Sequence, residues 1–228
     1  TVAAKQLRVS SPYGDWSGSG ELTDWHRFEL KGTADRIALD RLQATYLSKQ
    51  YPWNASLTGP VAFGGELSAA GLSNAHGEAV LDITPREGEL PVEGQLDVNW
   101  NQSTGKVGLN SSYLATAGAR LNLQGTLGEK LEVGLFATRL RDLNPIIAML
   151  AGEPDFELPV TLREGEARVD ATLDGPLNAG QMRGKAALTN VVFQDILFAR
   201  AESRFQLGRD ELRLQGLSLA MQKARATG

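Results

Sequence analysis

A short segment in the middle of the chain reads Ala119-Arg-Leu-Asn-Leu-Gln-Gly-Thr-Leu127, with apolar residues or glycine at the odd positions and polar residues at the even ones. Successive side chains of a β-strand point to opposite faces, so this alternation collects the aliphatic side chains on one face of a sheet. The segment therefore predicts a half-buried strand with one apolar face.

The same alternation returns along nearly the whole chain and predicts about fourteen strands. The links between them are short, as at Gly128-Glu129 and Gln102 to Gly105, and links of this length join antiparallel neighbours. Open twisted sheets rarely exceed about ten strands without curling or splitting into two layers. We therefore expect an all-β fold, a long antiparallel meander that bends over on itself.

Three segments depart from the alternation. Asn144-Pro145 at one end and Gly152 at the other predict a short helix over 145–151, followed by a loop and a possible subdomain joint around 144–159. At Gly216 the apolar phase slips by one residue, which predicts a β-bulge. Gly18 and Gly20 are interpreted as part of a tight turn or bulge, and the places of Trp16 and Trp25 beside them stay open.

Composition excludes several classes of function. The 228 residues carry a net charge of −4, with 23 basic residues scattered among 27 acidic ones, so no basic surface for a nucleic acid is expected. The chain has no cysteine, and neither His26 nor His76 has partners at the spacing of a metal site. No nucleophile elbow or phosphate-binding loop is present. We expect a protein that is not an enzyme and that binds no metal or other cofactor.

The apolar face of so much sheet has to be covered. Two arrangements satisfy this requirement: a dry sandwich of two sheets, or an open trough filled by apolar guests. Exposed apolar patches are rare, which favours the sandwich from periodicity alone.

The stretch from Leu158 to Gly228 resembles the repeats of the TamB and AsmA-like family. The resemblance rests on glycine, proline and alternation in Gly165-Glu-Ala-Arg-Val-Asp-Ala-Thr-Leu-Asp-Gly-Pro-Leu177, in Gly180-Gln-Met-Arg-Gly-Lys-Ala-Ala-Leu188, and in the strand that ends at Leu214. Leu140 to Leu150 resembles the short helix that interrupts these repeats. The likeness extends from about Leu90 to the end of the chain.

The resemblance implies an open trough (a β-taco), formed by a single β-groove fragment (1–228) of a larger protein. That parent protein would be anchored in the inner membrane of a Gram-negative bacterium and span the periplasm. Its groove would shield phospholipid acyl chains as lipid moves between the inner and outer membranes, with a TamA-like outer-membrane β-barrel as partner. The inner-face residues that would line the groove are Leu96, Val98, Trp100, Leu121, Leu123, Leu131, Val133, Leu135, Val169 and Leu173.

Two other functions stay open at this point. An open-edged fragment is able to self-associate through its strand edges, and the same edges could template an outer-membrane β-barrel or autotransporter client by strand addition. A carbohydrate-active β-sandwich would use two facing carboxylates, yet Glu93, Asp97, Glu132, Glu166 and Asp170 all fall at the outward phase of their strands.

Overall fold

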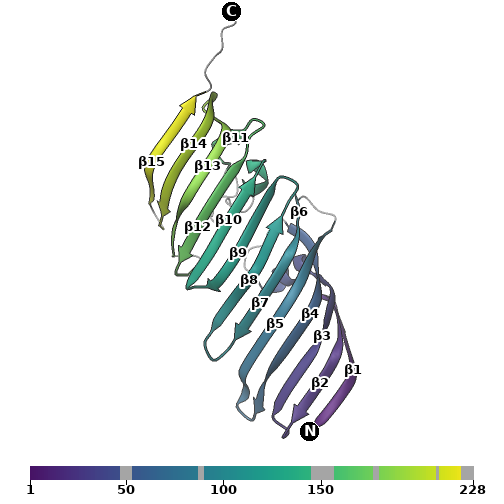
Figure 1. Cartoon of the computed structure of the whole chain (residues 1–228). Helices are drawn as coiled ribbons and strands as arrows, with labels where there is room; N and C mark the ends of the chain where they lie inside the picture. Colours follow the sequence, from purple (N-terminus) through teal and green to yellow (C-terminus); the bar gives the residue numbers. More distant parts are fainter. Residues whose placement is uncertain (47–52, 87–89, 145–156, 177–179, 209–210, 222–228) are drawn as a thin grey trace, which may run out of the picture. The chain divides into compact units, whose positions relative to one another are not determined.

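The computed structural model describes residues 1–46, 53–86, 90–144, 157–176, 180–208 and 211–221. Within these residues the chain is an antiparallel meander, in which successive strands are neighbours in one sheet (Figure 1). The strand order is β1-β2-β3-β4-β5-β7-β8-β9-β10-β12-β13-β14-β15, with β11 paired to β13 and β6 paired in parallel to β4. The predicted all-β class and antiparallel meander are confirmed.

Contacts divide the chain into two compact units, one made of residues 1–114 and 123–127 and the other of residues 115–122 and 128–228. The first holds β1 (Val2–Ser11), β2 (Gly14–Thr23), β3 (Arg27–Ala38), α1 (Leu39–Tyr46), β4 (Trp53–Ser68), β5 (Gly71–Pro85), β6 (Leu90–Pro91), β7 (Glu93–Asn101) and nearly all of β8 (Lys106–Ala115). Strand β9 (Ala119–Leu127) contributes to both units.

The second unit holds β10 (Lys130–Ala137), the 3-10 helix η1 (Leu140–Leu143), β11 (Val160–Leu162), β12 (Ala167–Asp174), β13 (Gln181–Phe193), β14 (Ile196–Leu207) and β15 (Leu212–Met221). Among the described residues β1 and β15 each pair on one side only, so the sheet is not closed into a barrel.

The register places the alternating apolar residues in rows that cross each unit. In the first unit Leu30 lies opposite Phe63, and the row continues through Gly77 to Trp100. In the second unit Leu131 lies opposite Leu173. The row continues from Leu173 across the next three strands, through Met182 and Leu207 to Leu212. Directly opposed residues of an antiparallel pair share a face, so each unit has one apolar face.

Bulges in the long strands shift the alternation by one residue and so keep apolar residues on the same face of the sheet. The predicted bulge at Gly216 is confirmed, because Gly216 and Leu217 of β15 together lie opposite the single residue Ser203 of β14, and Gly216 has a φ of 65°. A similar extra residue occurs in β3, where Arg36 has a φ of 50° and its backbone N–H donates to Thr58 Oγ1. Because each bulge adds one residue, the apolar residues after the bulge point to the same face of the sheet as the apolar residues before it.

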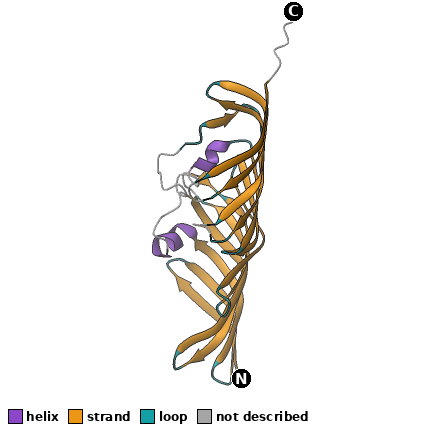
Figure 2. Ribbon diagram, turned by 90° about the vertical axis from the view of Figure 1, so that its left-hand side faces the viewer, coloured by secondary structure: helices purple, strands orange, loops and turns teal. Residues whose placement is uncertain are grey.

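Short helices cover part of the apolar face in each unit. Leu39, the first residue of α1, packs with Ile37 against buried Leu57 and Ile83. Leu140 of η1 packs in the same way against buried alanines of the second unit. Figure 2 shows both helices in purple beside the strands. The helix α1 is not predicted by the alternation, and the predicted helix over 145–151 lies outside the described residues, as does most of the predicted joint at 144–159.

No thick core accompanies these helices. Of the seventeen buried apolar residues within the described ranges, nine are alanines, and none of the large side chains is more than 98% buried. Ser112 is the one buried polar residue among them, and its hydroxyl accepts from the Asp97 N–H at 3.0 Å and donates to the Asp97 C=O at 3.1 Å. Much of the apolar face therefore stays in contact with solvent in the described structure.

Candidate apolar binding face

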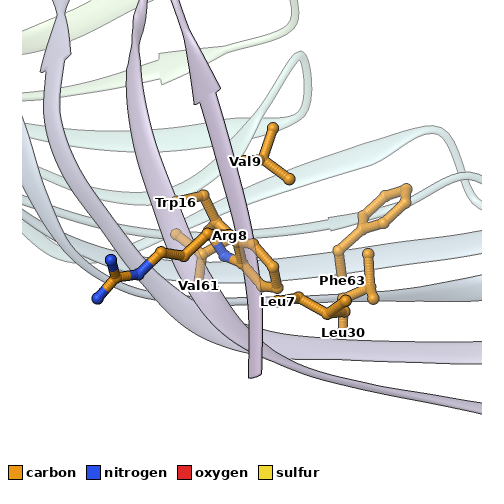
Figure 3. Close-up of a pocket in the computed structure, with 7 residues that line it drawn as sticks. All are labelled: Leu7, Arg8, Val9, Trp16, Leu30, Val61 and Phe63. Atoms are coloured by element: carbon orange, nitrogen blue, oxygen red, sulfur yellow. The ribbon is translucent and has the colours of Figure 1, made fainter. Parts of the chain in front are cut away.

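The apolar face of the first unit contains a hollow of about 360 Å³. Four neighbouring strands, β1 to β4, contribute its lining, which shows that this part of the sheet is concave on the apolar side. Figure 3 shows the side chains in place. The lining residues are Leu7, Arg8, Val9, Trp16, Leu30, Val61 and Phe63.

Arg8 is the only charged residue of this lining, and its guanidinium points away from the apolar side chains (Figure 3). Its neighbours Leu7 and Val9 are on the other side of the alternating strand β1 and face the hollow. The surface that a guest would contact is therefore hydrocarbon and aromatic ring, which suits an apolar ligand and offers no group for acid–base or nucleophilic chemistry.

Glycines form the floor beneath Trp16. Gly18 and Gly32 lie directly opposite each other on β2 and β3. A Cβ added at Gly32 would lie 2.7 Å from two indole carbons of Trp16, and one added at Gly18 would lie 2.7 Å from the indole as well. The Trp16 indole therefore lies over two residues that have no side chain, and it forms part of the lining of the hollow.

Aromatic side chains extend the apolar face beyond the hollow. The Phe28 and Phe63 rings lie 5.6 Å apart between centroids, and the Phe63 ring is stacked on Trp100 at 6.4 Å with an interplanar angle of 7°. These distances are in the range of favourable aromatic pairs. The three rings come from β3, β4 and β7 and lie in neighbouring rows of one face.

The opposite face of the same strands is polar. His76 Nε2 lies 3.5 Å from Glu29 Oε1 across β4, where Gly64 leaves room for the imidazole. In the second unit Arg183 pairs with Asp174 at 2.6 Å and Arg168 with Glu166 at 3.1 Å. These ionisable side chains are partly exposed and lie in pairs, so the two faces of each sheet differ in polarity.

The predicted lining residues fall on the apolar rows. Leu96, Val98 and Trp100 of β7 lie opposite Leu81, Ala79 and Gly77 of β5 and are half-buried. In the second unit Leu131 and Leu173 are buried opposite each other, and the register also pairs Val133 with Ala171 and Leu135 with Val169. Leu121 and Leu123 of β9 are half-buried on either side of exposed Asn122.

The hollow itself is built from residues that the sequence prediction did not include. Leu30, Val61 and Phe63 belong to recognised alternating segments, but sequence does not show that β1 to β4 curve around one space. Gly18 and Gly20 lie inside β2 and not in a turn. They lie opposite the two ends of a bulge in β1, between Ala4 and Leu7, so of the two interpretations only the bulge agrees with the structure. Trp25 is 81% exposed at the β2–β3 turn and has no place in the hollow.

Comparisons with protein-family models, with characterised proteins and with solved structures find no match to this chain. Within the described residues there is no group of three or more potential metal-ligating side chains. None of the helices in the described part of the chain has the length and hydropathy needed to cross a membrane.

Proposed function

We propose that this chain shields lipid acyl chains on the apolar face of its sheet and so helps phospholipid to move between the inner and outer membranes of a Gram-negative envelope. The observation that carries the proposal is the hydrocarbon-lined hollow between β1 and β4, which the described residues leave open. A second sheet packed on this face would have removed such a hollow, and the described strands all belong to the meander and its two side pairings.

The energetics support this use of the surface. Moving hydrocarbon from water to an apolar surface gains about 0.8 kcal/mol for each buried CH₂ group. Acyl chains are flexible and have no polar groups, so an apolar lining without buried charges holds them at many equivalent positions. A lipid headgroup is strongly hydrated and would remain in water, outside the hollow.

The resemblance to the TamB and AsmA-like family supports the cellular setting of the proposal. On this basis the chain is a periplasmic portion of a larger protein, with phospholipid as its cargo and a TamA-like β-barrel as its outer-membrane partner. The described residues contain no group arranged for catalysis, so the proposed function is to bind and guide lipid without changing it.

A second function is favoured by one specific observation: among the described residues β1 and β15 each pair on one side only. Open edges are able to accept a strand of a β-barrel client during its assembly. In that case crosslinks to a client would map to the backbone of β1 or β15, whereas lipid crosslinks would map to residues of the hollow.

Lipid co-purification tests the proposal. The chain is purified without detergent from bacterial cells and analysed by native mass spectrometry, followed by titration with a fluorescent long-chain acyl probe. We expect adducts with phospholipid masses, and saturable probe binding that competes with added phospholipid. A chain that carries no lipid and shows no saturable binding of the probe would contradict the proposal.

A further inference from the structure

Among the described residues β15 pairs on one side only, and the sequence along its other edge is unusual. All ten of its residues are exposed, and its large apolar side chains are between 51% and 64% exposed. Arg213 is its only charged residue, and the strand contains no lysine or proline. Charges and prolines are the devices that commonly protect sheet edges from pairing, so β15 is poorly protected. The opposite edge β1 differs, since it carries Lys5 and Arg8.

The bulge at Gly216 makes the polarity of β15 symmetrical about its own centre. Before the bulge Leu212 and Leu214 face the apolar side, because they lie opposite Leu207 and Phe205 of β14. After the bulge Leu219 faces the same side, opposite Ala201, and Met221 follows it by alternation. The polarity of the strand therefore reads the same from either end, with Gly216 and Leu217 in the middle.

We propose that β15 pairs antiparallel with β15 of a second copy of this chain. A two-fold axis perpendicular to the sheet, between Gly216 and Leu217, sets Leu214 opposite the partner's Leu219. With the same axis, Leu212 lies opposite the partner's Met221, and Gln215 lies opposite the partner's Ser218. Opposed residues of an antiparallel pair must share a face, and this register satisfies that condition for every apolar residue outside the bulge.

The bulge is essential to this match. A two-fold axis between two residues always pairs an even-numbered position with an odd-numbered one, and in a regular strand such positions lie on opposite faces. The extra residue at Gly216 shifts the second half of β15 by one and removes the conflict. Arg213 then lies opposite the partner's Ala220, so no like charges are opposed.

Engineered cysteines test the register directly, because the native chain has no cysteine. The variants Leu214→Cys and Leu219→Cys are made separately, and each is oxidised alone and in an equimolar mixture. Opposed positions of an antiparallel pair are close enough for a disulfide. We expect a covalent dimer in the mixture and little in either variant alone. Equal crosslinking in all three samples, or none in any, would overturn the proposed register.

Charge variants test the interface without relying on oxidation. Sedimentation of the wild-type chain over a dilution series is expected to approach twice its 24.5 kDa mass at high concentration. The double variant Gln215→Lys with Ser218→Lys opposes like charges twice and should weaken dimerisation about tenfold or more. A mixture with Gln215→Glu plus Ser218→Glu should restore it as a heterodimer.

The matched control places the same two charges on the other edge, as Gln6→Lys with Ser10→Lys in β1, and should leave the dimer unchanged. Circular dichroism reports whether each variant keeps its sheet. A monomeric wild-type chain at every concentration, or oppositely charged variants that do not form a heterodimer, would overturn the proposal. These measurements need no lipid, so their outcome is independent of the proposed function.

Discussion

Val61→Asp is expected to lower the affinity for an acyl probe about tenfold or more. Val61 lines the hollow from β4 and lies between Gly32 and Ala79 on the apolar face. A carboxylate there would either be desolvated by the bound chain or keep water in the hollow, and both cost free energy that the wild-type surface does not lose. A loss of 1.4 kcal/mol is already a tenfold change in affinity.

Its control is the next residue on the same strand. Ala62 is half-buried like Val61 but faces the polar side, between Lys31 and Glu78. Ala62→Asp adds the same charge to the same strand and should leave probe affinity within about twofold of wild type. Thermal unfolding of both variants shows whether the sheet is intact. Equal losses of affinity in both variants would mean that the hollow is not where acyl chains bind.

Gly32→Val is expected to destabilise the chain by about 3 kcal/mol, the upper end for overpacking a tight site. A Cβ at Gly32 would lie 2.3 Å from the Ser17 carbonyl oxygen and 2.7 Å from the Trp16 indole, so both β2 and the ring would have to move. Denaturant unfolding, monitored by Trp fluorescence and circular dichroism, measures the change. Probe binding should fall as well, because the displaced indole forms part of the lining.

Gly134→Ala is the matched control, since it also lies inside a strand. A Cβ there would have its nearest neighbours at 3.8 Å, which is ordinary contact. Replacing a glycine in an unstrained strand position reduces the entropy of the unfolded chain, so this change should be neutral or stabilising by up to about 1 kcal/mol. If both variants are equally stable, the close approach of Gly32 to Trp16 does not hold the wall of the hollow.

Sequence reasoning works best here for features that follow from local alternation. The two-residue period identifies the strands and the face of each residue, and the phase slip at Gly216 identifies the bulge. The lining residues from Leu96 to Leu173 fall on apolar rows for the same reason. Each of these features depends on the order of residues within one strand or one hairpin.

The features that sequence reasoning misses depend on contacts between distant segments. The helix α1 forms where Leu39 packs on Leu57 and Ile83, and eight residues between two strands give no clear period of their own. The bulge in β3 occurs at Arg36, a residue type that does not mark a left-handed position. The hollow requires β1 and β4 to curve toward each other over the Gly18–Gly32 pair. This curvature involves four strands, so the sequence of any one strand does not predict it.

Quenching of single tryptophans by brominated acyl chains tests the central claim most directly. Two proteins are compared, one that keeps only Trp16 and one that keeps only Trp25, with phenylalanine at the other three tryptophan positions. Bromine on an acyl chain quenches an indole only at close contact, Trp16 lines the hollow, and Trp25 is 81% exposed at a turn. The account predicts saturable quenching of Trp16 by brominated phospholipid and little quenching of Trp25. Equal quenching of both, or no quenching of Trp16 while lipid remains bound to the protein, would contradict it.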